Sequence, residues 1–276
     1  ICSPIVILLI GFISSGLTFS LGALLISVSL FITVTYPRPA NIFLFFGVLL
    51  GLGTSFIFHS TLYVLKTSLF HHLALANGII SSGACAGTLV QSFVIGPLCT
   101  KYTLKTVFMI YSAFMLIFSL ISFGVYMIAY LKKSRNKIIQ PLKINNDEHK
   151  MLEFLKNKKF ILVCSSCFIF CFGYLIIYFH MQIYYISTLS SAKNTSNIIG
   201  YFFLGSFIGR LFFGVIATYT GEKTIYLLIT CFLSMGLLNI ASILCISFIS
   251  FFSYCILLGI FDGGYNALIF PVSCDI

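Results

Sequence analysis

The chain consists mostly of apolar segments that are long enough to cross a lipid bilayer. About 20 consecutive apolar residues form a helix that spans the hydrocarbon core. Nine segments of the 276-residue chain fit this length in full or in part. Because backbone N–H and C=O groups need partners inside lipid, segments of this kind form helices. The sequence therefore predicts an all-α membrane protein.

Short polar or turn-forming stretches, such as TYPRPAN and TGEKT, separate the predicted spans. The first 36 residues are too long for one span, so we expect a turn near Ser14-Ser15-Gly16. The predicted spans are residues 1–12, the stretch from this turn to Val34, and then 41–65, 76–99, 105–131, 160–187, 196–218, 224–247 and 251–272.

Composition supports a membrane protein and argues against an enzyme. Hydrophobic residues make up 59% of the chain and charged residues 8%, whereas a soluble chain carries roughly a quarter charged residues. No phosphate-binding loop, H-E-x-x-H or G-x-S-x-G motif is present. Cys164 and Cys167 form a C-x-x-C, but they lie inside a span, where small apolar residues pack helices. We predict no cofactor and no metal.

The net charge of +10 reflects loops rather than a nucleic-acid surface. Nine Lys and Arg residues lie in the hydrophilic loop 132–159, and the loops on its side carry eleven against four on the other side. The positive-inside bias places this loop in the cytosol. The sequon at Asn194 then lies outside, as glycosylation requires.

Two charges interrupt the apolar spans. Arg210 lies in IIGYFFLGSFIGRLFFGVIAT and Asp262 lies in FSYCILLGIFDGGYNALIF. A charge inside a span is costly and normally pairs, faces a polar cavity or marks a substrate path. Both residues lie roughly 16–21 Å from the outer end of their spans at 1.5 Å per residue, so they could meet. Snorkelling of Arg210, or a neutral buried Asp262, is the alternative.

Three further polar residues are candidates for substrate binding, two of them in the same cavity. Tyr265 and Asn266 follow Asp262 by about one helical turn. His180 lies nearer the outer end of its span, where it could accept a proton or bind an anion. A place in an aromatic interfacial belt with Tyr184 explains His180 equally well.

Glycines recur at four-residue spacing on four segments. This spacing lets two helix backbones approach closely, and it predicts a tightly packed helical bundle. The pairs are Gly47/Gly51, Gly83/Gly87, Gly205/Gly209 and Gly259/Gly263.

Several of these stretches resemble the monocarboxylate transporter family of the major facilitator superfamily. Residues 71–78 (HHLALANG) are similar to a cationic stretch followed by Leu-Ala-x-Gly, and Phe172-Gly173-Tyr174 with His180 is similar to the first helix of the second half. Gly209-Arg210-Leu211 with Gly214 resembles the arginine helix, and residues 259–263 with Pro271 resemble the tenth helix.

The resemblance implies two six-helix halves that alternate access to a midplane site. The halves would be 1–131, without the first helix, and 160–276, without the last two, joined by 132–159. The chain starts at Ile1 without a methionine, so we expect a fragment. The family's gating motif survives as Gly214, Gly221 and Lys223 without its acid. Ser206 stands where proton-coupled members carry an aspartate.

We therefore expect a symporter or facilitator that carries a small carboxylate-bearing solute, an organic anion or an amino acid. The combination of His180, Arg210 and Asp262 is most similar to carriers of aromatic amino acids or thyroid hormones. The resemblance also implies a plasma-membrane location, a lipid bilayer around the helices and a single-span ancillary protein as a partner. The alternative is a non-transporting membrane protein, such as a sensor, an assembly partner or the product of a decayed gene.

Overall fold

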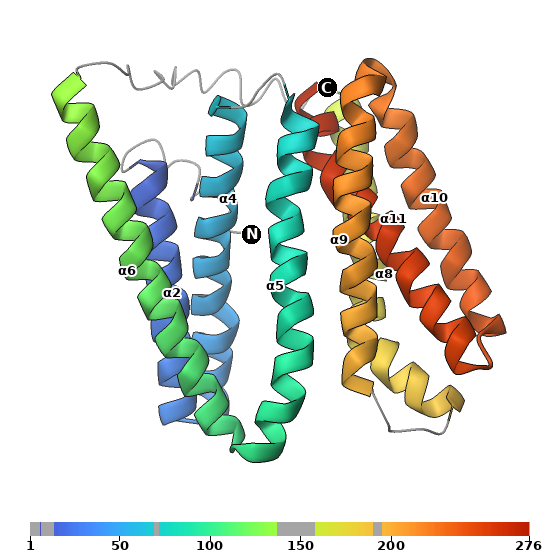
Figure 1. Ribbon diagram of the computed structural model, residues 1–276, viewed down its shortest axis with the longest axis horizontal. Coiled ribbons are helices and arrows are strands. Elements are labelled where there is room, and N and C mark those ends of the chain that lie inside the picture. The colour runs from blue at the N-terminus through green and yellow to red at the C-terminus, as the bar shows by residue number, and fades with distance from the viewer. Residues whose placement is uncertain (1–5, 7–13, 69–71, 137–157, 190–194, 276) are drawn as a thin grey trace. The chain divides into compact units, whose positions relative to one another are not determined.

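The computed structural model describes residue 6 and residues 14–68, 72–136, 158–189 and 195–275 (Figure 1). Every element in this part of the chain is a helix, as the sequence predicts. The bounds are α2 Ser15–Thr35, α3 Pro39–Asn41, η1 Ile42–Leu49, α4 Leu50–Ser68, α5 Leu73–Lys101, α6 Leu104–Asn136, α8 Lys158–Leu189, α9 Thr195–Thr220, η3 Gly221–Lys223, α10 Thr224–Ala241, η4 Ser242–Leu244 and α11 Phe248–Asp275.

Seven helices within these ranges are long and apolar enough to cross a membrane. They are Ser15–Thr35, Pro39–Ser68, Leu73–Cys99, Leu104–Ile128, Ile198–Thr220, Thr224–Leu244 and Phe248–Cys274. Each overlaps a predicted span, and α8 covers the predicted span 160–187. The predicted span 1–12 lies outside the described residues except for Val6, as do Asn194 and most of loop 132–159.

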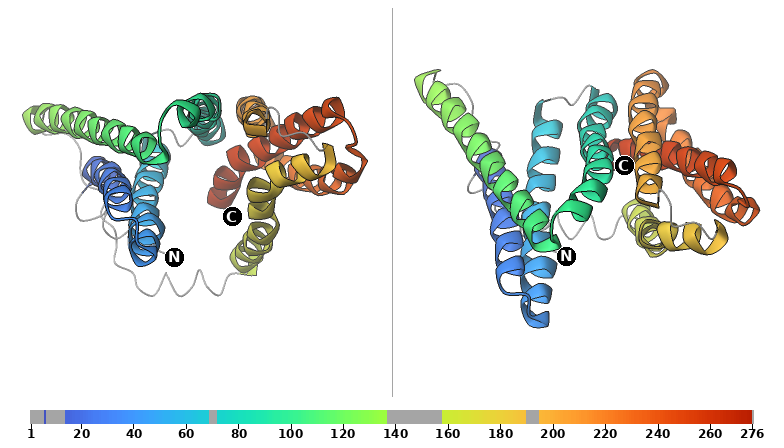
Figure 2. Two further views of the ribbon diagram at one scale, coloured as in Figure 1. Left: turned by 90° about the horizontal axis from the view of Figure 1, so that it is seen from below. Right: turned by 60° about the horizontal axis from the view of Figure 1, so that its bottom comes forward.

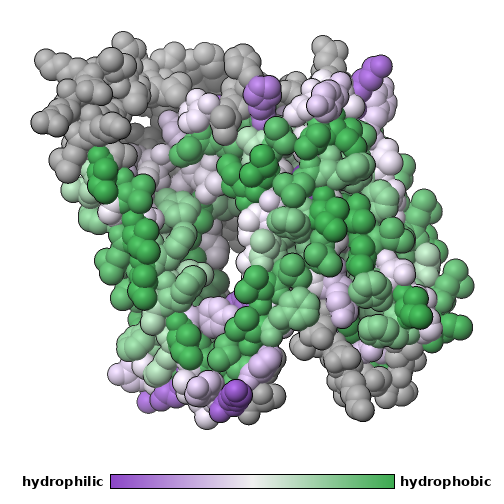
Figure 3. Space-filling model, viewed as in Figure 1, coloured by the Kyte–Doolittle hydropathy of each residue, from purple (hydrophilic) through white to green (hydrophobic). Residues whose placement is uncertain are grey.

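The surface carries the hydropathy pattern of a lipid-facing protein. In Figure 3 the sides of the helices are mostly hydrophobic, and the strongly hydrophilic residues lie toward helix ends. Large side chains such as Ile128, Leu237 and Ile240 are exposed. Contiguous exposed apolar surface of this kind is rare on soluble proteins, but it fits a hydrocarbon environment.

The chain divides into two compact units. The first contains residues 1–70 and 98–146, and the second contains 71–97 and 147–276. Most of α5 therefore belongs to the same unit as α8–α11. The predicted boundaries of two six-helix halves remain a prediction.

In the first unit, α2 packs against both α4 and α6. The Ser27 hydroxyl donates to the carbonyl of Ser112 (2.8 Å), and the Ser112 hydroxyl donates back to the carbonyl of Ser27 (3.0 Å). Gly22 and Gly53 bring α2 and α4 together, since a Cβ at either position would lie within 2.8 Å of the other's carbonyl oxygen. Small residues and serine bonds to backbone are the usual means of helix association in lipid.

In the second unit, α9 and α11 form the most extensive helix contact, and Figures 1 and 2 show the two helices crossing. Their glycines face each other's backbone. A Cβ at Gly205 or Gly209 would collide with the carbonyls of Ile256 or Ile260. A Cβ at Gly259 or Gly263 would collide with those of Phe202 or Ser206. The two backbones are therefore in direct contact.

The other glycine pairs behave differently. Gly47, Gly51, Gly83 and Gly87 are exposed, and a Cβ there would meet no described atom within 4 Å. The packing role predicted for these four glycines stays a prediction.

We predict that Gly259→Ala destabilises the protein, because a methyl group has no room beside the backbone of α9. Overpacking of this kind costs about 1–3 kcal/mol, which lowers Tm by several degrees. Thermal unfolding of the full-length protein in detergent measures the effect. Gly87→Ala is the matched control on an exposed face, and equal Tm values for the two variants would contradict the prediction.

Candidate functional site

Asp262 lies on α11 inside the contact with α9, and its side chain is completely buried. Both carboxylate oxygens accept hydrogen bonds. The Ser206 hydroxyl donates to Oδ2 (2.7 Å), and the amide Nδ2 of Asn266 donates to Oδ1 (3.0 Å). A buried carboxylate needs such donors, since it can only accept when ionised. Its neighbours on α9 and α11 therefore stabilise the Asp262 carboxylate inside the bundle.

Hydrogen bonds extend from Asp262 to two more helices. The buried Cys85 thiol on α5 donates to the Ser206 hydroxyl (3.3 Å). Asn266 Nδ2 also lies 3.4 Å from the hydroxyl of Tyr174 on α8. The result is a polar network that contains Cys85, Ser206, Asp262, Asn266 and Tyr174 and touches four helices.

Arg210 lies on α9 and is partly buried. Its Nη1 donates to the backbone carbonyl of Ser81 on α5 (2.7 Å). Its Nε is buried and has no hydrogen-bond partner among the described residues. A guanidinium carries five N–H donors in a planar fork that matches a carboxylate, so Arg210 is anchored at one nitrogen and has donor capacity left at another.

The two predicted charges come together at one level of the bundle. A Cβ at Gly263, the residue after Asp262, would lie 2.8 Å from the backbone nitrogen of Arg210. Arg210 and Asp262 therefore stand on adjacent helices where the backbones touch. A direct ion pair between their side chains remains a prediction.

Tyr265 and Asn266, both predicted for this cavity, have different environments. Asn266 binds Asp262 as described above. Tyr265 is buried, and its ring centroid lies 4.2 Å from that of Phe170 on α8. The ring centroid of Phe232 on α10 lies 6.4 Å from that of Tyr265 and 5.6 Å from that of Phe170. Tyr265 therefore contributes to an aromatic cluster next to the polar network.

His180 is exposed on α8, and the hydrogen bonds given above for Asp262 and Arg210 come from other residues. Two tyrosines that follow it on α8 make contacts with other helices or with the core. Tyr184 donates its hydroxyl proton to the carbonyl of Ser242 (3.0 Å), and Tyr185 is buried in the core. A role of His180 in binding remains a prediction.

The residues predicted for gating lie near the ends of α9 and α10. Gly214 packs against Gly78 of α5, with a Cβ position 3.4 Å from the Gly78 Cα. Gly221 has φ +52°, a left-handed conformation that glycine adopts without strain. It begins the single turn η3, and Lys223 in the same turn is exposed.

Sequence reasoning missed Ser81, Cys85 and Tyr174 as partners of this site. Ser81 acts through its backbone carbonyl, which every residue possesses, so its side chain gives no signal. Cys85 lies in an apolar stretch of the sequence with nothing to mark it, yet it is buried and donates a hydrogen bond. Tyr174 lies in a motif that was noted only for its resemblance.

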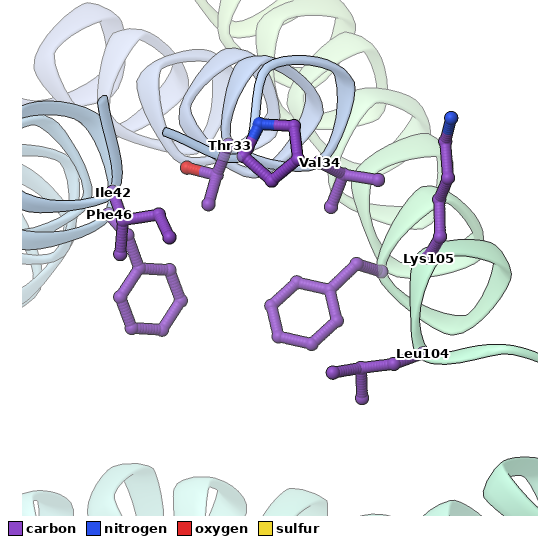
Figure 4. A pocket seen from close by; sticks show the side chains of 8 residues that line it. Thr33, Val34, Ile42, Phe46, Leu104 and Lys105 are labelled. Atoms are coloured by element: carbon purple, nitrogen blue, oxygen red, sulfur yellow. The ribbon is translucent and has the colours of Figure 1, made fainter. Parts of the chain in front are cut away.

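A separate pocket of about 350 Å³ lies in the first unit, between the C-terminal end of α2, η1 and the start of α6 (Figure 4). None of the predicted site residues lines it. Its walls are mostly apolar, with Lys105 at one side. The lining residues are Thr33, Val34, Pro37, Ile42, Phe46, Leu104, Lys105 and Phe108.

Comparison with known proteins gives consistent matches over the chain. The family model described as Major Facilitator Superfamily matches residues 1–276. Monocarboxylate transporter 10 of Mus musculus is 24% identical over 288 residues, which cover all of this chain and 55% of that protein. The Homo sapiens protein of the same name is 25% identical with the same coverage. An MFS-type transporter of Aspergillus fumigatus is 23% identical over 219 residues, covering 75% of this chain and 50% of its own.

Because the family model matches the whole chain, the protein belongs to the Major Facilitator Superfamily. It is a multi-pass membrane protein of a class of transporters, not of enzymes. Within this class it is similar to monocarboxylate transporters, and it spans about half the length of the curated relatives it matches.

We predict that Ser206→Ala destabilises the protein, because it removes a donor from a fully buried carboxylate. Leaving a buried acceptor without its donor costs about 1–3 kcal/mol. Thermal unfolding in detergent measures this loss. Thr218→Ala is the matched control, since the Thr218 hydroxyl is exposed and bonds within α9. A Tm equal to that of the control would show that the Ser206 bond contributes nothing.

Proposed function

We propose that the protein is a secondary transporter that moves a small carboxylate-bearing organic solute across a membrane by alternating access. The solute class is a monocarboxylate or an aromatic amino acid-like compound. The observation that carries the proposal is Arg210, a half-buried cation inside an apolar bundle with an unfilled buried donor at Nε. A charge placed at such a cost normally serves a substrate or ion path.

Arg210 would bind the solute carboxylate. The bond from Nη1 to the Ser81 carbonyl holds the guanidinium in place, and this leaves its remaining N–H groups for a ligand. A guanidinium that is already held in place binds a planar carboxylate better than a mobile guanidinium does, because less side-chain freedom is lost on binding. The names of the relatives, which specify monocarboxylate transport for those proteins, support this solute class.

Asp262 would balance the charge of Arg210. In the empty site it pairs with Arg210, and a solute that carries an amino group meets it instead. Ser206 and Asn266 both donate to the Asp262 carboxyl group and hold it in position for either role. Asn266 would line the solute site, and the ring cluster around Tyr265 would offer apolar contact to a ring or chain of the solute.

The remaining features of the proposed carrier follow from charge and from the family. We place loop 132–159 in the cytosol between the halves 1–131 and 160–276, with the protein in the plasma membrane. His180 would accept a proton or contact the solute near the outer end of α8. Gly214, Gly221 and Lys223 would take part in gating, and a single-span membrane protein would be an ancillary partner.

We predict that Arg210→Ala lowers uptake of the transported solute about 10- to 100-fold. This is the effect of losing a hydrogen-bonded charge pair worth about 1.5–3 kcal/mol. The measurement is uptake of labelled monocarboxylates and aromatic amino acids at two pH values, in cells that express the full-length protein. Arg210→Lys should lose most of the uptake as well, because a point charge cannot replace the fork.

Ser81→Ala is the matched control, since the hydrogen bond from Arg210 goes to the backbone carbonyl of Ser81, which alanine also has. This variant should transport like the unaltered protein. Full uptake by Arg210→Ala at normal surface expression would overturn the assignment of Arg210. An unaltered full-length protein that transports no solute of either class would favour the non-transporting alternative.

A further inference from the structure

Pro271 leaves one backbone carbonyl of α11 without its usual partner. Proline lies inside this helix and has no N–H to donate to the carbonyl four residues earlier. That carbonyl belongs to Ala267, which is completely buried. An unpaired carbonyl in a buried apolar environment costs about 1–3 kcal/mol, so the position calls for a donor from another element.

Asn77 of α5 supplies that donor. Its Nδ2 donates to the Ala267 carbonyl (2.9 Å) and lies 3.2 Å from the carbonyl of Asn266. Asn77 is itself buried, so its amide has little access to other partners. The bond therefore joins a donor and an acceptor that each depend on the other across the contact between α5 and α11.

The same side of α5 makes the other polar contacts of the site. Residues 77, 81 and 85 recur at four-residue spacing, so they lie along one face of the helix. Ser81 holds Arg210 through its carbonyl, and Cys85 donates to Ser206. Gly78, beside Asn77, packs against the backbone of Arg210. A Cβ at Gly78 would lie 2.6 Å from the Arg210 carbonyl oxygen. Of these polar contacts, the one made by Asn77 is nearest the N-terminal end of α5.

We propose that Asn77 is a latch that holds α5 against α11 at the carbonyl that Pro271 leaves open, and that this latch opens and closes as solute passes. The role of the latch in solute passage rests on the proposed transport function. A hydrogen bond between helices in an apolar environment is either made or broken, so it separates two arrangements of α5 more sharply than apolar packing does. When the bond breaks, the face of α5 that carries Cys85 separates from α9.

The test uses Cys85 as a reporter that needs no transport assay. Cys85 is buried against Ser206, so it reacts with N-ethylmaleimide only when α5 moves away. The full-length protein is alkylated in native membranes, and mass spectrometry measures the rate at Cys85. Cys231 on α10, also buried, is measured in the same sample and reports general loosening of the protein.

We expect Asn77→Ala to raise the alkylation rate of Cys85 about three- to tenfold while the rate at Cys231 stays unchanged. Loss of about one hydrogen bond shifts the open population by a factor of this size. Ser82→Ala is the matched control and should change neither rate, because the buried Ser82 hydroxyl donates to the Ile79 carbonyl of its own helix, α5.

The decisive variant combines Asn77→Ala with Pro271→Ala. Alanine at 271 returns an N–H to the Ala267 carbonyl, so removing the Asn77 amide should no longer accelerate alkylation relative to Pro271→Ala alone. An equal acceleration in both backgrounds, no acceleration at all, or a parallel rise at Cys231 would overturn the latch. Failure of uptake in the unaltered protein would overturn the proposed function but would leave the alkylation result unaffected.

Discussion

The contact between α9 and α11 depends on four positions that carry no side chain. The backbone of α11 packs directly against Gly205 and Gly209, and the backbone of α9 packs directly against Gly259 and Gly263. Lipid offers helices no hydrophobic gain from association, so close packing and interhelical hydrogen bonds must hold them together. The contact also determines the surroundings of Asp262. Gly263 packs against the backbone of Ser206, so the Ser206 hydroxyl can reach the carboxylate of Asp262, the residue before Gly263.

Several polar groups of the second unit pair with residues of other helices. Arg210 bonds to α5, Asp262 bonds to α9, and Asn77 bonds to a carbonyl that Pro271 makes available. Each bond crosses between helices, and each lies where an unpaired group would be costly. Charge and packing are therefore coupled: a shift of α5 would alter the anchor of Arg210 and the partner of Ser206 together.

The sequence predicted the helices well and the contacts less well. Span-length apolar segments could be placed because lipid permits few other structures, and α2 begins at Ser15, where a turn was expected. The glycine spacing was the same in Gly83/Gly87 as in Gly205/Gly209, yet only the second pair meets a neighbouring backbone. Neither Gly22 nor Gly53 has another glycine four residues away in the sequence. The two nevertheless bring α2 and α4 together. Spacing shows that a close approach is sterically allowed, but the partner helix decides whether it occurs.

The sequence by itself determined that the chain is a bundle of membrane-spanning helices and that Arg210 and Asp262 are exceptional within it. Hydropathy and charge are properties of single residues and their neighbours along the chain, so they can be read without a structure. The tertiary structure alone decided the partners of these charges. Arg210 meets the carbonyl of Ser81, and the carbonyl of Ala267 meets Asn77. Every residue carries a backbone carbonyl, so no sequence pattern marks the one that a side chain on another helix will reach.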